Sequence, residues 1–235
     1  MSYQRTPYRA ALGLGGRLTP GIKWLLIANF SVYVLQVLML RLTGARMDAL
    51  FGLSAGDVFH RLYLWQLVTY MFLHSPIWLT HILLNMLMLW MFGTDIERAW
   101  GTRLFLKYYF ICGIGAGITT ILTFPDVPTI GASGALFGIM LAYAMQFPHR
   151  QIYLWFLFPM RAWVFVMACA GIELFNLLGL PDGIAHSAHL GGMLVGYLYL
   201  KRAWRLREFW REIRWKLRRR RFRVMHQDDE HYPYH

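Results

Sequence analysis

Six long apolar runs, separated by shorter polar segments, dominate the pattern of residues along this chain. A helix that crosses a membrane needs roughly 20 mostly apolar residues. The runs that meet this requirement are 22–40, 77–94, 104–124, 130–147, 162–179 and 183–200. The pattern therefore predicts six membrane-spanning helices.

Two further apolar segments are too short or too interrupted to span. The first, 41–76, is rich in aromatic residues such as Trp65, which favour the level of the lipid headgroups. We expect it to form interfacial helices lying in or on the outer leaflet. The second, QIYLWFLFPM at 151–160, covers about half of a span and is ended by Pro159 and Arg161. We expect it to form an interfacial loop before the fifth helix.

Composition indicates an integral membrane protein, and the six helical spans make all-α its expected fold class. The chain is 57% hydrophobic and 15% charged, whereas soluble domains carry about 25% charged residues. The two cysteines, Cys112 and Cys169, lie within apolar runs and suggest neither a disulfide framework nor a metal site. No secretory signal peptide is recognisable, because the first apolar run comes late and no small-residue cleavage site follows it.

Basic residues set the expected orientation, because Lys and Arg are retained on the cytoplasmic side of a membrane. They occur in the N-terminal arm, in the connections 95–107 and 148–161 and in the C-terminal tail, but not in 125–129 or 180–185. The segment 41–76 fits less well, because it contains Arg41, Arg46 and Arg61. This alternation predicts six spans with both chain ends in the cytoplasm. The expected divisions are a cytoplasmic arm (1–20), a six-helix domain (21–201) and a basic cytoplasmic tail (202–235).

The tail is strongly basic: residues 201–223 contain 12 of the 24 Lys and Arg residues of a chain whose formal net charge is +12. Apolar residues recur within it at helical spacing, at Leu206, Trp210, Ile213 and Leu217. Nucleic-acid binding is one interpretation, because basic and aromatic residues interleave. We favour an amphipathic helix on anionic lipid, where each Lys or Arg contributes about 1 kcal/mol, and we expect no nucleic-acid partner.

In this topology the second, fourth and sixth helices begin at the outer side, and all three carry polar residues in their first turns. The second helix has His81 and Asn85, four residues apart and hence on one face. The fourth has Ser133, and the sixth has His186 and His189. Polar groups within a bilayer are expensive and often functional, so their convergence at one depth predicts a functional site.

These residue types suit hydrolysis by a serine nucleophile. A serine hydroxyl attacks a carbonyl only when a base takes its proton, and histidine is the usual base near neutral pH. The oxyanion that results needs hydrogen-bond donors, which His81, Asn85 and the Ser133 backbone N–H can supply. Ser133 also lies near a helix N-terminus, where free N–H groups and the helix dipole favour negative charge.

The neighbours of Ser133 fit this site and also have a simpler explanation. Gly131 and Gly134 suit a sharp entry to the helix, and Phe137, one turn later, can pack against an imidazole. Glycines four residues apart, such as Gly134 and Gly138, alone indicate close helix packing. We expect the glycines to serve both purposes.

Three stretches follow one another on alternate helices: HILLN at 81–85, GASG at 131–134 and AHLGGMLVG at 188–196. Together they resemble the rhomboid family of intramembrane serine proteases, and the similarity covers nearly all of the hydrophobic core. The resemblance implies a six-helix rhomboid-like bundle with an interfacial helical loop between the first two helices. Many members have Trp-Arg in that loop where this chain has Trp65-Gln66, which leaves the anchoring of the loop open.

The same resemblance implies a catalytic dyad of Ser133 and His189, with His81 and Asn85 at the oxyanion. Its glycines Gly131 and Gly134, with Phe137 and Gly192, are the supporting residues.

Two further polar residues need an interpretation. His189 rather than His186 matches the family position, because Gly192 and Gly196 follow it at the expected spacing. We expect His186 to be an exposed loop histidine. Glu173 could orient His189 as a third member, but a structural hydrogen bond or snorkelling to the interface is the favoured interpretation, since a dyad suffices in this family.

The expected function is hydrolysis of a peptide bond in or near the transmembrane segment of membrane-protein substrates, without metal or other cofactor. One alternative is a catalytically silent rhomboid-like protein that binds transmembrane helices. Another is a transporter, which predicts polar groups along a whole route. The sequence has no HExxH zinc motif and no pair of intramembrane aspartates. We expect a bacterial inner membrane, because the six-span core has no appended domain.

Overall fold

The structure, a computed structural model, describes residues 17–125, 128–154, 158–179 and 184–203. The chain divides into two compact units, Met1–Tyr197 and Leu198–His235. In the second unit residues 198–203 are helical, and the expected amphipathic stripe of the tail lies outside the described residues. The elements and the candidate site described below belong to the first unit.

Each of the six apolar runs contains a helix, and within the described ranges three of these helices are long and apolar enough to cross a membrane. The three are α1 (Pro20–Thr43), the continuous helix Leu79–Trp100, and α7 (Thr102–Thr123). The second consists of α5 (Leu79–Met88), the π-helical turn η2 (Leu89–Gly93) and α6 (Thr94–Trp100). Two shorter apolar helices are α8 (Ser133–Gln146) and α9 (Ala162–Leu177). Residues 186–197 form the last helix of the unit, called the His189 helix below.

The segment between α1 and α5 folds into short helical turns. They are α2 (Asp48–Phe51), α3 (Ala55–His60), α4 (Gln66–Thr69) and the 3₁₀ turn η1 (Tyr70–Phe72). The fully buried Gln66 side chain joins them: its Oε1 accepts from the Ser54 N–H, and its Nε2 donates to Asp57 Oδ2, both at 3.1 Å. This amide therefore anchors the loop at the position where an arginine is common in the family.

The stretch expected to be an interfacial loop contains two short strands. β1 (Gln151–Leu154) pairs antiparallel with β2 (Phe158–Arg161), with Gln151 opposite Arg161. Ile152 is 4% exposed while the residues on either side of it are exposed, which is the two-residue burial period of a strand. The sequence reading missed the hairpin because nearly every residue in the run is apolar, so the alternation of burial leaves no pattern.

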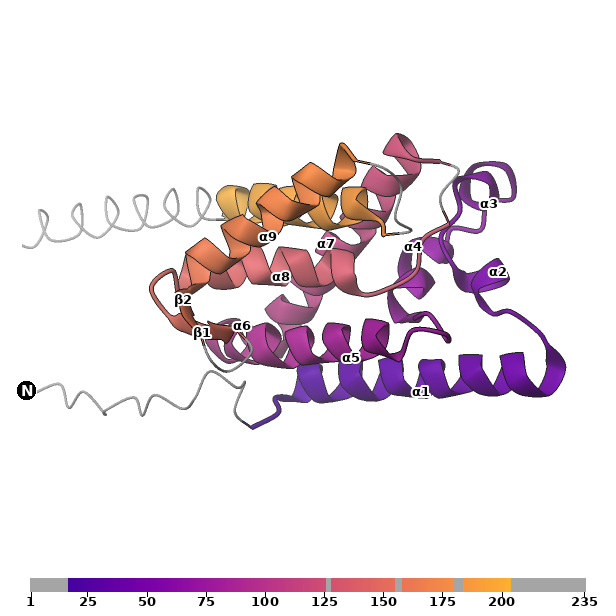
Figure 1. Cartoon of the computed structure of the whole chain (residues 1–235), viewed down its shortest axis with the longest axis horizontal. Helices are drawn as coiled ribbons and strands as arrows, with labels where there is room; N and C mark the ends of the chain where they lie inside the picture. Colours follow the sequence, from indigo (N-terminus) through magenta and orange to yellow (C-terminus); the bar gives the residue numbers. More distant parts are fainter. Residues whose placement is uncertain (1–16, 126–127, 155–157, 180–183, 204–235) are drawn as a thin grey trace, which may run out of the picture. The chain divides into compact units, whose positions relative to one another are not determined.

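Helix α8 packs against α7, α5 and α9, and Figure 1 shows it between α5 and α9. Its first turn also touches the His189 helix through glycine. A Cβ on Gly192 would lie 1.9 Å from the Gly134 carbonyl oxygen, and a Cβ on Gly134 would lie 2.5 Å from Ala116 Cβ. The two backbones can approach this closely only without side chains. This contact brings Ser133 and His189 within reach of one another.

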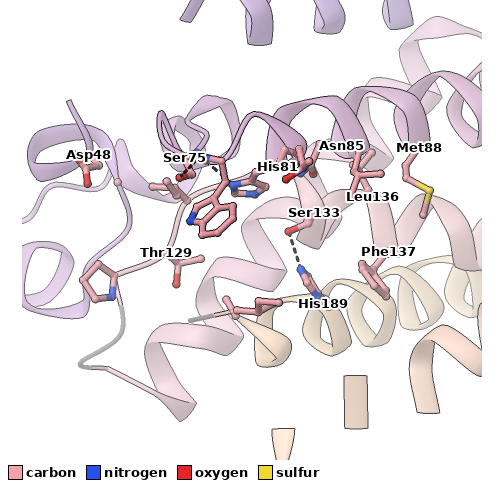
Figure 2. Close-up of a pocket in the computed structure, with 18 of the residues that line it drawn as sticks. Asp48, Ser75, His81, Asn85, Met88, Thr129, Ser133, Leu136, Phe137 and His189 are labelled. Atoms are coloured by element: carbon pink, nitrogen blue, oxygen red, sulfur yellow. Dashed lines mark hydrogen bonds between the residues drawn. The ribbon is translucent and has the colours of Figure 1, made fainter. Parts of the chain in front are cut away.

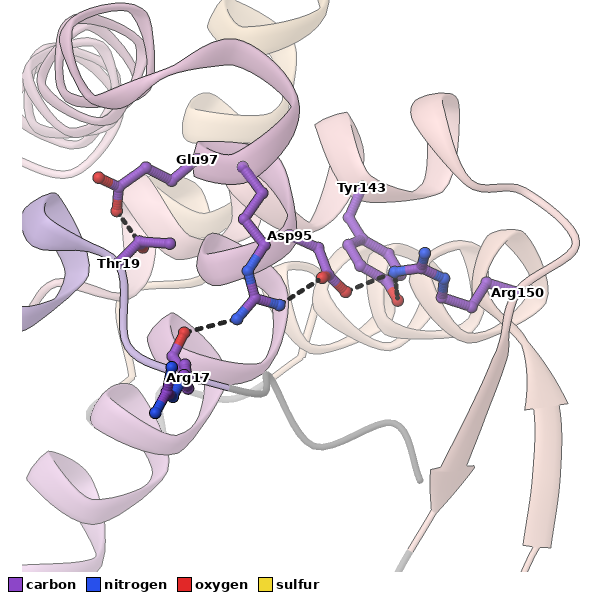
Figure 3. Close-up of polar contacts among 7 residues, drawn as sticks. Arg17, Thr19, Asp95, Glu97, Tyr143 and Arg150 are labelled. Atoms are coloured by element: carbon purple, nitrogen blue, oxygen red, sulfur yellow. Dashed lines mark hydrogen bonds and ion pairs between the residues drawn. The ribbon is translucent and has the colours of Figure 1, made fainter. Parts of the chain in front are cut away.

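A polar cluster ties the helices together near the far end of α8 from Ser133 (Figure 3). Asp95 of α6 forms ion pairs with Arg150, which follows the end of α8, and with Arg98. The Arg98 guanidinium also donates to the Arg17 carbonyl oxygen at 2.5 Å. Through these contacts, α6 holds both the segment that precedes α1 and the segment that follows α8.

Glu97 of α6 serves two helix starts at once. Its carboxylate accepts hydrogen bonds from the N–H groups of Gly21 (2.7 Å) and Ile22 (2.9 Å) in the first turn of α1. It also accepts from the Thr19 hydroxyl, drawn in Figure 3, and from the Thr102 hydroxyl (2.6 Å) at the start of α7. A negative group at a helix N-terminus is favourable because unpaired N–H groups and the helix dipole meet there.

Replacing Glu97 by alanine is therefore expected to lower the free energy of unfolding by at least about 2 kcal/mol, because a hydrogen bond to a charged group contributes about 1.5–3 kcal/mol. The midpoint temperature of thermal unfolding of the purified protein in detergent reports this loss. The Glu97→Gln variant keeps an acceptor oxygen, so its midpoint should lie between those of the wild type and the alanine variant. Equal melting temperatures for the alanine variant and the wild type would contradict the role given to this carboxylate.

Candidate active site

Ser133 is the first residue of the 14-residue helix α8 and follows a backbone turn that glycine makes possible. Gly131 has a φ of +124°, a value that side-chain-bearing residues rarely adopt, and its N–H donates to the Tyr70 carbonyl oxygen at 2.9 Å. A Cβ at Gly131 would also lie 2.8 Å from His81 Nε2. The GASG sequence thus places a serine at a helix N-terminus with an imidazole close beside it.

His189 faces Ser133 from the neighbouring helix. Its Nε2 lies 2.8 Å from Ser133 Oγ, the contact drawn as a dashed line in Figure 2. Phe137, four residues after Ser133, stacks on the imidazole with ring centroids 4.4 Å apart and planes 8° apart. The structure therefore brings a hydroxyl, a base and an aromatic wall together, in the geometry that proton transfer from serine to histidine requires.

His81 and Asn85 approach the same place from α5. His81 Nδ1 accepts a hydrogen bond from the Ser75 N–H at 3.3 Å, so in the neutral ring the hydrogen is on Nε2, which faces Gly131. Asn85 Nδ2 instead donates to the His81 carbonyl oxygen at 2.7 Å, and its Oδ1 is buried with no partner in the described part of the chain. His81 is thus oriented as a donor beside Ser133, whereas one N–H of the Asn85 amide is taken by the His81 carbonyl oxygen, which leaves the second N–H as a further donor.

These groups line a cavity of about 1200 Å³ (Figure 2). Its walls come from residues in the segments 46–52, 75–88, 128–140 and 184–189. Many of the side chains are apolar. His81, Asn85 and His189 lie around Ser133, whereas Asp48 lies toward the other end of the pocket (Figure 2). Apolar walls with a few convergent polar groups are typical of a site that binds a mostly apolar substrate.

His74 is a further residue of this region, and the sequence reading did not single it out. It is fully buried, its ring lies edge-on to His81 with centroids 5.1 Å apart, and neither ring nitrogen has a hydrogen-bond partner among the described residues. Burial, and next the proximity of His81, lowers the pKa of His74 to about 3. The ring is therefore neutral at physiological pH and supports His81 by packing rather than by charge.

His186 lies elsewhere than expected, and Glu173 makes a hydrogen bond with it, one of the expected alternatives. His186 is not an exposed loop residue: it is 7% exposed and is the first residue of the His189 helix. Its Nδ1 lies 2.6 Å from Glu173 Oε2, and the same oxygen lies 2.8 Å from His189 Nδ1. The Glu173 side chain, 13% exposed, does not snorkel away from the site. It contacts the ring nitrogen of His189 that does not face Ser133.

Comparison with known proteins places the chain among related sequences. A family model described as the Rhomboid domain matches residues 61–205, more than half of the chain. The chain is 36% identical over 137 residues to "Rhomboid protein 1, mitochondrial" of Saccharomyces cerevisiae, covering 54% of this chain and 38% of that protein. It is 30% identical over 127 residues to "Rhomboid-like protease 3" of Toxoplasma gondii, covering 53% and 48%.

A bacterial relative is also similar. The chain is 31% identical over 139 residues to "Rhomboid protease GluP" of Bacillus subtilis, covering 57% of this chain and 25% of that protein. The matched part is thus less than half the length of each of these three relatives. In this chain the matched family domain includes all the residues assembled around Ser133 in Figure 2 from α5, α8 and the His189 helix.

Proposed function

The chain belongs to the rhomboid family of integral membrane proteins, and we propose that it is an intramembrane serine endopeptidase. The observation that carries the proposal is the 2.8 Å contact between Ser133 Oγ and His189 Nε2. The cavity around this pair supports it, because a peptide segment needs space to reach the serine. Relatives named as proteases, from Toxoplasma gondii and Bacillus subtilis, support it as well.

In the proposed reaction, His189 Nε2 takes the Ser133 proton while Oγ attacks a peptide carbonyl. The oxyanion forms near the His81 Nε2–H and the Ser133 backbone N–H, with the second N–H of the Asn85 amide as a further donor. His189 then gives its proton to the leaving amine, and the C–N bond breaks. Water hydrolyses the acyl-serine with His189 acting again as the base. No step needs a metal or an organic cofactor.

We propose that the substrates are transmembrane segments of other membrane proteins. Leu84, Leu136 and Met140 lie in the cavity wall and suit the apolar side chains of such a segment. A regular helix keeps its carbonyl groups in hydrogen bonds, so the segment must unwind locally before Ser133 can attack. The preferred substrates should therefore have helix-breaking residues near the scissile bond.

We further propose that all six helices span the bilayer, with both chain ends in the cytoplasm. Three helices have the length and composition for this, while α8, with 14 residues, and α9, with 16, are shorter than a typical span of roughly 20 residues. The short elements α2 to α4 would then lie at the outer interface. The bacterial inner membrane and the binding of anionic lipid by the basic tail stay predictions from the sequence, and the relatives include mitochondrial proteins.

The test is cleavage in liposomes that contain the purified protein and one single-span substrate. Two substrates differ only in the outer turn of their helix, which is all leucine in one and contains Gly-Pro in the other. We expect the Gly-Pro substrate to be cut and the leucine substrate to resist, with no cleavage of either by the Ser133→Ala variant. Stable binding of both substrates without any cleavage would favour the catalytically silent alternative instead.

A further inference from the structure

Glu173 introduces a carboxylate among apolar helices, next to the proposed dyad. It comes from α9, whose apolar sequence otherwise offers no acidic residue. An ionisable group at membrane depth is costly and is retained where it has partners. The partners of Glu173 are two histidines, His186 at 2.6 Å and His189 at 2.8 Å, and the side chains of all three are at most 13% exposed.

The carboxylate and the serine lie at the two different nitrogens of the His189 ring. Nε2 faces Ser133 Oγ, and Nδ1 faces Glu173 Oε2. A carboxylate at Nδ1 favours the tautomer with hydrogen on Nδ1, which leaves the lone pair of Nε2 directed at the serine. The distance between His189 Nδ1 and Glu173 Oε2 is short, but the two groups are not aligned as a hydrogen bond. The attraction between the carboxylate and the ring is therefore stronger when the His189 imidazole is positively charged than when it is neutral.

These contacts suit shared protons better than a metal ion. Glu173, His186 and His189 have the residue types of a metal site. However, ligands bound to zinc at about 2.0 Å in a tetrahedron lie about 3.3 Å from one another. The carboxylate oxygen lies 2.6 Å and 2.8 Å from the two ring nitrogens, distances typical of hydrogen bonds and ion pairs.

We propose that Glu173 is a positioning residue that extends the Ser133–His189 dyad to a triad, and that His186 holds the Glu173 carboxylate in place. The inference rests on the proposed protease function. The proton of Ser133 moves to His189 Nε2, and Glu173 stays ionised throughout. Its charge stabilises the imidazolium while Oγ bonds to the carbonyl carbon, and that stabilisation ends when the proton passes to the leaving amine.

Turnover of the Gly-Pro substrate in liposomes tests this. In serine proteases with a triad, replacing the aspartate by asparagine lowers kcat by about 10⁴-fold. Because the contact here is not aligned, we expect Glu173→Gln to lower kcat by roughly 10²-fold with little change in KM. His186→Gln should cause a smaller loss, since it only frees the carboxylate. Leu174→Ala, at an exposed position beside Glu173, should leave kcat unchanged.

A second pair of variants separates charge from shape. Glu173→Asp and Glu173→Asn have side chains of the same size, and only the first keeps the charge. We expect the aspartate variant to be at least about tenfold faster, by the logic of the triad carboxylate. Equal kcat for the two, wild-type kcat in Glu173→Gln, or a loss of wild-type activity on adding a chelator would overturn the inference. Wild-type protein that cuts nothing would instead overturn the protease proposal itself.

Discussion

Replacing Ser133 by alanine is expected to abolish cleavage of a transmembrane substrate, and replacing His189 by alanine should do the same. The serine supplies the attacking oxygen, and the histidine 2.8 Å away takes its proton. In a soluble serine protease, loss of either residue lowers kcat by about 10⁶-fold. We expect a comparable loss here, because the attack needs both a nucleophile and a base and each residue supplies one of them. Rates of substrate cleavage in liposomes measure the effect.

A matched control for the serine exists in the same region. Ser187 is 4% exposed, and its hydroxyl donates to Thr120 Oγ1 at 3.3 Å. It is therefore buried and hydrogen-bonded, and it does not belong to the residues that line the cavity. Ser187→Ala should therefore keep cleavage near the wild-type rate. Residual cleavage by Ser133→Ala within tenfold of the wild type would assign the chemistry to another residue.

Loss of the His81 side chain is expected to have the second largest effect. Its Nδ1 is occupied by the Ser75 N–H, which leaves the Nε2–H directed at the space beside Gly131. Removal of one oxyanion donor typically costs about 10²–10³ in kcat. We expect His81→Ala to fall in this range. Asn85→Ala should cost less, because one N–H of the Asn85 amide already donates to the His81 carbonyl oxygen and only the second remains for the oxyanion.

Steady-state kinetics distinguish an oxyanion donor from a substrate contact. An interaction made only in the transition state lowers kcat and kcat/KM together, whereas a binding contact raises KM. Leu83→Ala, on an exposed face of α5, serves as the control and should change neither. A His81→Ala and Asn85→Ala double variant with wild-type kcat would remove both residues from the mechanism.

Much of the helical arrangement could be predicted from hydrophobic length alone. The ends of α7 and α8 lie within three residues of the predicted runs 104–124 and 130–147, because lipid and backbone hydrogen bonding restrict such runs to helices. The proximity of Ser133 and His189 could be anticipated because the depth of a residue in a bilayer follows from its distance along the sequence from the end of its helix. Both residues lie in the first turns of helices that begin at the same side.

Lateral contacts could not be predicted in the same way. Which face of α9 meets the His189 helix depends on rotation about the helix axis, so the sequence left open whether Glu173 orients His189, forms a structural hydrogen bond or snorkels to the interface. The direction of the Asn85 amide depends on competition with its own helix carbonyl. The role of Gln66 depends on partners 9 and 12 residues away that only the folded loop brings together.

The central claim is that His189 activates Ser133, and fluorophosphonate labelling tests it most directly. The reagent reacts with an activated serine hydroxyl and needs no substrate helix, so its rate reports the dyad alone. Wild-type protein in detergent should be labelled, while Ser133→Ala and His189→Ala proteins of equal thermal stability should not. Absence of labelling in folded wild-type protein, or equal labelling of the Ser133→Ala variant, would contradict the account.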